Sequence, residues 1–371
     1  MASPIDRITI KGYKSIRSLE DFELRPINLL IGANGAGKSN FVSFFSLLRE
    51  LVEGRLALAV NQAGGAGFQL YLGPKVTKKI KAHFRFGMNE YTFALVPAAD
   101  NRLIFEDERI KYSGAQNREQ VDRSIGEGQS ESKLQENLNP EGTTPGISDY
   151  VYKAISGWIV YHFHDTSTTS DLRRSWTIRD RGKLRPNGEN LAAFLWGLRS
   201  NHRRFFDRIR DTVRLVAPFF NDFVLRPQSS NGDISVLLEW TQKNSDYPFH
   251  PSQLSDGTLR FIALATALLQ PNPPSTMLID EPELGLHPFA IETLASLILQ
   301  TSKRTQVIVS TQSASLLNSF EPEDIVVVDR EKGESRFRRL SREDLQSWLE
   351  EDYSLGELWQ KGVYGGGPVH E

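Results

Sequence analysis

The chain has 371 residues, which is enough for one large domain or two ordinary ones around a sizeable buried core. Hydrophobic residues make up 39% and charged residues 24%, as in a typical globular protein, and no apolar run approaches the roughly 18–20 residues that span a bilayer. Cysteine is absent, which excludes disulfides and cysteine-ligated metal centres. We therefore expect a cytoplasmic protein that makes no membrane contact.

The net charge of −2 is unevenly distributed. Residues 173–226 contain thirteen Lys or Arg against five Asp or Glu, so they hold a local excess of positive charge. A basic segment of this kind favours DNA or RNA as a partner. Solvated helix faces, or a face that docks on an acidic protein, would have the same composition.

The first third of the chain is expected to contain mainly strands. Residues 6–31 have strand-like spacing of apolar residues, and the wholly apolar run 27–31 is typical of a buried parallel strand. A glycine-rich turn follows, and then a helix at about 38–53. The alternating pattern over 79–112 predicts an antiparallel meander.

The middle of the chain changes character. Residues 113–147 are rich in Gly, Gln, Asn, Ser and Glu, and we expect a long surface insertion that is partly disordered or only locally helical. Order returns over 149–164. Helices are predicted near 189–199 and 202–216, and strands near 222–227 and 234–240.

From residue 252 onward, helices and strands alternate. The predicted helices are 257–270, 288–301 and 313–319, and the predicted strands are 276–281, 305–310 and 324–328. This alternation predicts a parallel sheet with helices on its faces.

The clearest motif is the P-loop Gly32–Ser39, which matches G-x-x-x-x-G-K-[ST]. Its glycines let successive backbone N–H groups surround phosphates, and the following helix directs its positive end at the same anion. We expect Lys38 to contact the β- and γ-phosphates and Ser39 to ligate Mg²⁺. Other residues in or beside the loop are expected to bind the nucleotide, namely Asn34, Gly35, Gly37 and Asn40.

Two acids end the apolar strand that begins at Thr276. Asp280 is placed to hold Mg²⁺, and Glu281 is placed to orient or deprotonate the attacking water. A GTPase or a small-molecule kinase usually lacks the second acid. The pair therefore favours an ATPase that takes ATP and Mg²⁺ as cofactors.

Upstream of these acids, Leu254-Ser-Asp-Gly-Thr258 precedes a helical run. It resembles the signature of ABC-type ATPases, in the form found in the SMC/RecF/OLD-like group. The resemblance implies an α/β fold: an ABC-type P-loop head with a mixed or parallel core sheet, an antiparallel β-meander and a helical lobe. It also implies ATP hydrolysis in a homodimer or higher homo-oligomer, with Ser255 and Gly257 acting on the opposite subunit's nucleotide. A P-loop kinase would have no use for this signature.

The same resemblance suggests further site residues. Gln312 stands where the family commonly has a switch histidine; its amide can bind phosphate or water but carries no charge. Lys14 matches a basic residue that relatives place near the nucleotide. The family also has a glutamine that ligates Mg²⁺, for which Gln62 and Gln69 are the candidates and Gln62 is preferred.

The resemblance divides the chain into five regions. These are an N-terminal ATPase lobe with P-loop and meander (1–112), a polar insertion (113–147), a helical basic segment (148–220), a C-terminal ATPase lobe with signature, acid pair and switch (221–335) and a tail (336–371). There are no heptads for an SMC coiled coil, and too few residues follow the last strand for a Toprim nuclease.

We therefore expect a stand-alone ATPase that regulates a separate effector, such as a nuclease, or a DNA transaction in antiviral defence or DNA repair. The alternative is a slowly hydrolysing or non-hydrolysing scaffold that holds a toxic effector. Two features stay open. His162-Phe-His164-Asp165 is either a strand-end turn or a metal cluster, and the segment from Ser354 is either a docking peptide or a frayed terminus.

Overall fold

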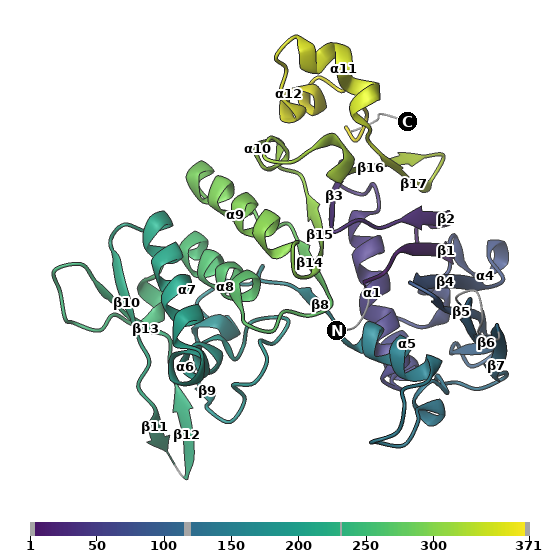
Figure 1. The fold of residues 1–371 in the computed structure, drawn as a ribbon, viewed down its shortest axis with the longest axis horizontal. Helices are drawn as coiled ribbons and strands as arrows, with labels where there is room; N and C mark the ends of the chain where they lie inside the picture. Colours follow the sequence, from purple (N-terminus) through teal and green to yellow (C-terminus); the bar gives the residue numbers. More distant parts are fainter. Residues whose placement is uncertain (1–3, 115–119, 231, 368–371) are drawn as a thin grey trace.

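The computed structural model describes residues 4–114, 120–230 and 232–367. Two six-stranded sheets dominate these residues, one largely parallel and one antiparallel. Figure 1 shows the largely parallel core sheet at the centre, with the antiparallel sheet on one side and a lobe of helices and short strands on the other. The expected head with a meander and a helical lobe is therefore confirmed.

The core sheet is assembled from strands that are far apart in the sequence. Its order is β17 (Glu334–Arg339), β16 (Ile325–Glu331), β3 (Ile27–Ile31), β15 (Gln306–Thr311), β14 (Thr276–Asp280) and β8 (Trp158–Tyr161). All neighbours are parallel except β16 and β17. The predicted strands from 252 onward are β14, β15 and β16, and the region 149–164 contributes the edge strand β8.

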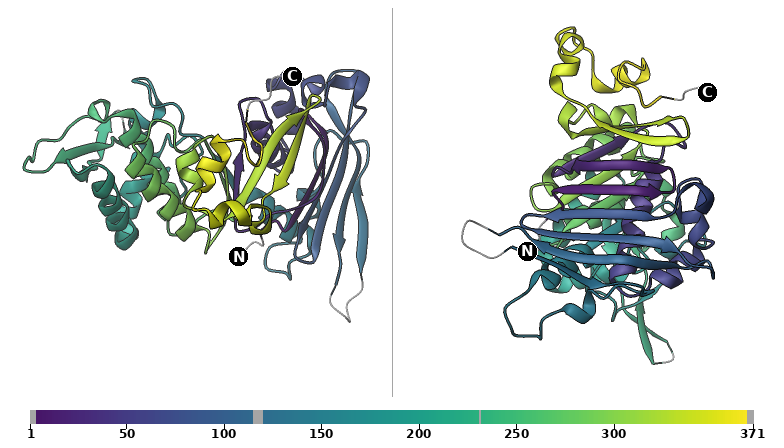
Figure 2. Two further views of the ribbon diagram at one scale, coloured as in Figure 1. Left: turned by 90° about the horizontal axis from the view of Figure 1, so that it is seen from above. Right: turned by 90° about the vertical axis from the view of Figure 1, so that its right-hand side faces the viewer.

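The antiparallel sheet contains the predicted meander and one strand more. Its order is β2 (Ile16–Glu23), β1 (Arg7–Tyr13), β4 (Ile80–Phe86), β5 (Asn89–Pro97), β6 (Leu103–Tyr112) and β7 (Val121–Gly126). Figure 2 shows this sheet face-on in its right-hand view.

Strand β7 corrects the expectation for the polar segment 113–147. Its residues pair with β6, because they continue the ladder of the meander. Further along, Leu134 is buried in the core, and the carboxylate of Glu131 accepts hydrogen bonds from two N–H groups at the start of helix α2 (Leu56–Gln62). The described part of the segment is therefore ordered, and residues 115–119 lie outside the described residues.

Helices cover both faces of the core sheet. Helix α1 (Lys38–Val52) and α5 (Ile147–Ser156) lie between the core and antiparallel sheets, whereas the other face is covered by α8 (Asp256–Leu269) and α9 (Pro288–Thr301). The helical lobe adds α6 (Leu191–Asn201), α7 (Arg203–Val216) and two small sheets formed by β9 (Trp176–Thr177), β10 (Phe220–Val224), β11 (Gln228–Ser230), β12 (Asp233–Val236) and β13 (Glu239–Gln242).

One hydrophobic core lies on each face of the core sheet, and membership in a core shows which way each strand residue points. In β14, Leu278 packs on the α1 side and Met277 on the α8 side; in β15, Ile308 and Val309 divide in the same way. Side chains alternate along a strand, so the polar residues that follow these strands can be assigned to one face.

The described part of the C-terminal tail is attached to the core. Helix α12 (Leu355–Gln360) packs against α10 (Ala314–Leu317), and the Gly366 N–H donates to Asp329 at 2.6 Å. The tail up to residue 367 is thus not frayed. The remaining helical elements are α3 (Ala66–Gln69), α4 (Gly73–Val76), α11 (Arg342–Glu350), η1 (Gln135–Asn137), η2 (Asp171–Arg173), η3 (Pro251–Gln253) and η4 (Pro322–Asp324). Among the described helices, none has the length and apolarity needed to cross a membrane.

Candidate functional site

The polar motifs meet at one edge of the core sheet. Strands β3, β15, β14 and β8 run in parallel, so the P-loop, Gln312 and His162, which follow strands, and Asp280, which ends β14, lie at the same edge. In an open α/β sheet, this carboxyl edge is where ligands bind. Asp280 faces the α1 side, because its neighbour Ile279 packs on the α8 side.

The P-loop connects β3 to the first turn of α1. Gly37 has φ 117°, and a Cβ at this position would lie 2.0 Å from Ser335 Oγ, so only glycine fits. Lys38 is buried, and its Nζ donates to the carbonyl oxygens of Gly32 at 2.5 Å and Ala33 at 3.1 Å. The lysine is therefore held by the loop that is expected to bind phosphate.

The charge on Lys38 is balanced by three carboxylates. Burial lowers the pKa of Lys38, while the negative charges of Glu281, Asp280 and Glu283 oppose that shift. The acid pair and the P-loop are thus close enough to interact, as the sequence predicted for a phosphate and Mg²⁺ site.

A polar network supports the P-loop from the antiparallel side. Asn40 Nδ2 donates to Ser15 Oγ at 2.7 Å, and Ser335 Oγ donates to Ala36 O at 2.5 Å and lies 2.7 Å from Ser15 Oγ. Lys14 has φ 46°, and its Nζ donates to Ser43 Oγ at 2.9 Å on α1; burial lowers its pKa. These contacts place Lys14 and Asn40 beside the loop.

A cavity of about 320 Å³ opens next to this network. Lys14, Ser15 and Asn40 form part of its lining, and the other wall includes Phe68 and Leu72. These two apolar side chains are 73% and 63% exposed. The cavity thus combines polar groups near the P-loop with an exposed aromatic ring.

The acid pair is joined directly to the switch segment. Glu281 has φ 40°; its N–H donates to Ser310 O at 2.7 Å, and its carboxylate accepts a hydrogen bond from the Gln312 amide. The two residues that sequence analysis selected for catalysis are therefore in contact. Asp280 Oδ1 and Ser310 Oγ are buried and have no hydrogen-bond partner among the described residues.

Glu283 is a site residue that sequence analysis did not select. Its Oε1 accepts from Thr311 Oγ1 at 2.6 Å and from the Gln312 N–H at 2.9 Å, so it fixes the switch segment beside Glu281. Burial raises the pKa of Glu283, and these hydrogen bonds only partly oppose the shift. The signal available in the sequence was its place two residues after Glu281.

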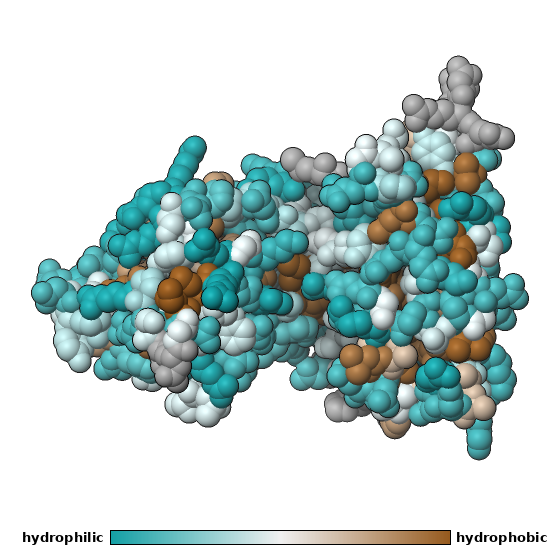
Figure 3. Space-filling view, turned by 90° about the horizontal axis from the view of Figure 1, so that it is seen from below, coloured by the Kyte–Doolittle hydropathy of each residue, from teal (hydrophilic) through white to brown (hydrophobic). Residues whose placement is uncertain are grey.

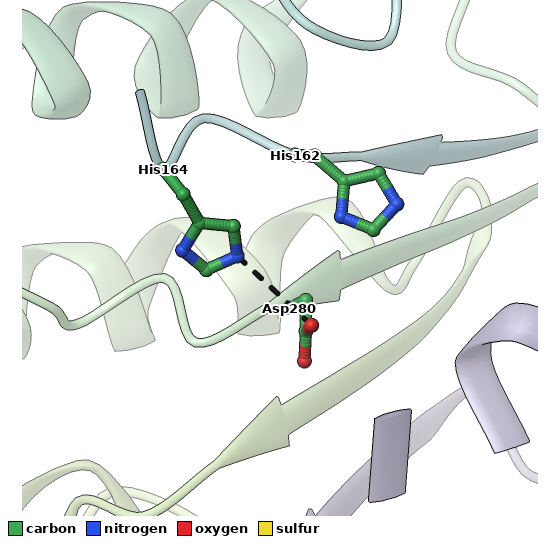
Figure 4. Close-up of side chains that lie close together, drawn as sticks. All are labelled: His162, His164 and Asp280. Atoms are coloured by element: carbon green, nitrogen blue, oxygen red, sulfur yellow. Dashed lines mark ion pairs between the residues drawn. The ribbon is translucent and has the colours of Figure 1, made fainter. Parts of the chain in front are cut away.

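Two histidines lie at the end of β8, beside Asp280. His164 Nε2 is 3.9 Å from Asp280 Oδ2, and one ligand atom from each of His162, His164 and Asp280 lies within 4.8 Å of the others. Figure 4 shows both imidazoles on the side of β8 that faces the end of β14. Burial lowers the pKa of His162, which favours the neutral ring. The motif is a strand end, and its two histidines are grouped with Asp280 and not with Asp165; metal binding there stays a prediction.

Neither glutamine suggested as a Mg²⁺ ligand is at the edge of the core sheet. Gln62 is exposed at the end of α2. The P-loop precedes the first turn of α1, whereas α2 follows its last turn. A helix of 15 residues spans about 22 Å, so α1 ends about that far from Ser39 before α2 begins. Gln69 is buried in α3, and its backbone carbonyl accepts from the Lys14 N–H. The fold therefore gives no support to Gln62 as a Mg²⁺ ligand, and that role stays a prediction.

The signature motif begins helix α8. Ser255 is the N-cap, with its Oγ accepting from the Thr258 N–H at 3.2 Å, and it is exposed. A Cβ on Gly257 would lie 2.4 Å from Gly285 O, so glycine permits close packing on the loop after β14. Helix α8 packs on the face of the core sheet opposite α1. The action of Ser255 and Gly257 on a second subunit stays a prediction.

Two buried arginines attach the signature region to the strand ends. Arg260 donates to the carbonyl oxygens of Phe163 at 2.9 Å and His164 at 2.8 Å, and also to that of Leu284. Arg173 donates to Thr166 O at 2.9 Å and to Asp256 Oδ1 at 2.8 Å. Burial lowers the pKa of Arg260. Helix α8 is thereby tied both to the end of β8 and to the loop after the acid pair.

The sequence of the chain matches the family model described as "AAA domain, putative AbiEii toxin, Type IV TA system" over residues 27–318. This range includes the P-loop, the signature, the acid pair and Gln312. The chain belongs to this family. The AAA family model thus covers most of the protein, and it supports a P-loop ATPase. No curated protein matches the sequence.

Solved structures confirm the fold of this AAA-family chain. It resembles an SMC head bound to the C-winged helix domain of ScpA, with a TM-score of 0.54, 16% identity, and coverage of 93% of this chain and 99% of that chain. A second SMC head, with an extended coiled coil and bound to the C-terminal domain of ScpA from Pyrococcus furiosus, gives a TM-score of 0.52, 16% identity, and coverage of 94% and 99%. The predicted SMC-like head is therefore confirmed.

Proposed function

We propose that this protein hydrolyses ATP with Mg²⁺ at the carboxyl edge of its core sheet. The hydrogen bond between Glu281 and Gln312 carries the proposal. Glu281 directly follows Asp280 in the sequence and lies near Lys38. Glu281 deprotonates or orients water, and Gln312 holds its carboxylate in place. A preorganised base beside a phosphate-binding lysine is the arrangement that hydrolysis requires.

Mg²⁺ fits the residues at this edge. Asp280 Oδ1 is buried and has no hydrogen-bond partner among the described residues, so it can accept a bond from a metal-bound water. The Ser39 hydroxyl starts α1 directly after Lys38 and supplies an oxygen ligand of the kind Mg²⁺ prefers. When bound, the ion neutralises charge that develops on the phosphate.

The rest of the nucleotide fits along the P-loop and the adjacent cavity. Asn34, Gly35 and Gly37 surround the phosphates in this proposal. The base and ribose enter the cavity lined by Lys14, Asn40 and Phe68, where an exposed aromatic ring offers a stacking surface.

We further propose that ATP closes a homodimer. Ser255 is exposed at the N-terminus of α8, and α8 lies across the core sheet from the P-loop helix. A helix N-terminus binds anions, so the signature of one chain is suited to cap the nucleotide of a second chain. Two equivalent composite sites then form around a twofold axis.

The variant Glu281→Gln tests both proposals. It should bind ATP with wild-type affinity and hydrolyse it about 1,000-fold more slowly, because the amide cannot accept a proton. Light scattering should show a dimer of Glu281→Gln in ATP and a monomer without it, and the control Ser255→Arg should stay monomeric in ATP. Hydrolysis at the wild-type rate by Glu281→Gln would show that Glu281 is not the base.

A nucleotide-dependent scaffold is the second candidate function. The Gln312 amide already donates a hydrogen bond to the Glu281 carboxylate. Its side chain is also neutral, so it offers no positive charge to the γ-phosphate. A protein that holds ATP with little turnover would fit this contact. Steady-state hydrolysis by the isolated protein, with and without DNA, separates the two; robust turnover argues against the scaffold.

Control of a separate effector, such as a nuclease, is the biological role we propose, in antiviral defence or DNA repair. The family description names a toxin system, and the similar SMC heads were solved with ScpA domains. Co-purification from the native host, followed by nuclease treatment of the complex, tests this proposal. A stoichiometric protein partner supports it, and a nucleotide-dependent complex with nucleic acid alone contradicts it.

The basic segment 173–226 is a weaker candidate for binding DNA or RNA. Arg203 pairs with Asp207, and both Arg210 and Arg214 pair with Asp211, which neutralises part of the charge. Exposed cations remain in the segment at Arg179, Lys183, Arg199, Arg204 and Arg208. Figure 3 shows a mainly hydrophilic face interrupted by separate apolar patches. Binding to DNA that weakens steeply with salt would support this role.

A further inference from the structure

The end of β8 brings two imidazoles to Asp280. Strands β8 and β14 are parallel with Tyr161 opposite Ile279, so the next residues, His162 and Asp280, are neighbours across the sheet. Tyr161 and Phe163 are buried on the α8 side. Alternation therefore sends His162 and His164 to the other side, which Asp280 also faces.

The spacing of these three side chains is close to that of a metal site. The three ligand atoms lie within 4.8 Å of one another, and His164 Nε2 is 3.9 Å from Asp280 Oδ2. Ligands about 2.1 Å from one ion are about 3.0–3.4 Å apart in octahedral or tetrahedral geometry. Side-chain rotations that move the ligand atoms by about 1 Å would thus bring all three within bonding distance of one ion.

The oxygen of Asp280 that faces the histidines is Oδ2, whereas the buried and unpartnered Oδ1 is the one assigned above to the Mg²⁺ of ATP. The backbone of the histidine segment is already fixed, since buried Arg260 donates to the carbonyl oxygens of Phe163 and His164. The imidazoles therefore stand on a rigid support, and their partial exposure leaves an entry route.

We propose that His162, His164 and Asp280 form a binding site for a first-row transition metal such as Zn²⁺, distinct from the Mg²⁺ of ATP. Two imidazole nitrogens and one carboxylate oxygen suit such an ion, whereas Mg²⁺ prefers oxygen ligands and retained waters. Asp280 has two carboxylate oxygens, so an ion held through Oδ2 leaves Oδ1 for the nucleotide's Mg²⁺. The site needs no nucleotide, so it can fail or succeed independently of the proposed ATPase.

Cobalt(II) is the probe for this site, because its absorption bands report coordination. The chain has no cysteine, so thiolates cannot compete for the ion, and a tag-free protein avoids binding to added histidines. Calorimetry and absorption are measured with CoCl₂ alone, without ATP, on the wild type and on His162→Asn/His164→Asn. The matched control is His250→Asn, which changes an exposed histidine elsewhere in the chain.

The wild type and His250→Asn should bind one Co²⁺ per chain. The double variant should weaken binding by about 100-fold or more, because even loss of an outer-sphere partner typically costs 10- to 100-fold. Retained ATP binding by the double variant would show that it is folded. Equal Co²⁺ binding by wild type and double variant overturns the proposal. Co²⁺ binding that requires ATP also overturns it, since the histidines would then serve the nucleotide's own cation.

Discussion

The ends of β14 and β8 are adjacent at one edge of the core sheet, yet they differ in chemistry and in how far the sequence predicts them. The end of β14 places the acids Asp280 and Glu281 near the P-loop lysine. The end of β8 places His162 and His164 on the same side of the sheet. Neighbouring strand ends therefore provide different ligand types, oxygen for Mg²⁺ and imidazole nitrogen for a softer ion.

Of the substitutions considered, Lys38→Ala should have the largest effect, and it should affect ligand binding at only one of the two strand ends. Lys38→Ala should lose about 3 kcal/mol of ATP-binding free energy, or more than about 100-fold in affinity, because a buried charge contact with phosphate disappears. Binding of Co²⁺ at the histidines should not change. Titration calorimetry with each ligand makes the comparison, and parallel loss of both would show that the two ends form a single site.

Removing Arg260 should instead disturb both strand ends together. Arg260→Met leaves the carbonyl oxygens of Phe163, His164 and Leu284 without their donor, and we expect the free energy of unfolding to fall by about 2–3 kcal/mol. The matched control Arg330→Met removes an exposed hydrogen bond to Gly35 O and should cost less than about 0.5 kcal/mol. Equal losses in chemical denaturation would mean that Arg260 does not link the two ends.

Sequence patterns predicted the β14 end but not the β8 end, for a physical reason. The P-loop, the signature and Asp280-Glu281 are contiguous motifs, so each carries its own signal. Strand β8 has only four residues and acquires its position through pairing with β14, more than 100 residues away. The alternation in Tyr161-His-Phe-His164 was visible, but the partner Asp280 was not.

The fold gives no support to Gln62 for a related reason. Gln62 and Gln69 both follow the P-loop helix in the sequence. In the fold, the end of that helix leads away from the phosphate site, and β8 takes the position beside β14. A local motif can thus be assigned from sequence, whereas a residue delivered by tertiary pairing requires the structure.

The smallest effect is expected at Glu283, which belongs to the β14 side alone. Its folded-state pKa is raised by burial, so the stability it contributes is present below its unfolded pKa of about 4.5 and is lost as pH rises through the folded-state value. Glu283→Gln should therefore increase the free energy of unfolding at pH 8 relative to wild type, with a smaller gain at pH 4.5.

Denaturation at several pH values measures this difference. Glu292→Gln, an exposed position on α9, is the matched control and should show no such trend. If Glu283→Gln destabilised the protein more at pH 8 than at pH 4.5, the carboxylate of Glu283 would be ionised in the folded state and would stabilise it.

Mixing two inactive variants tests the central claim most directly. Lys38→Ala lacks a working P-loop and Ser255→Arg lacks a working signature, so each alone should hydrolyse almost no ATP. A mixed dimer has one intact composite site out of two, so an equal mixture should regain about a quarter of wild-type activity if the chains pair at random, and up to half if only mixed dimers form. If mixing restores no activity while subunits are shown to exchange, each chain hydrolyses ATP alone or not at all, and the composite-site account is wrong.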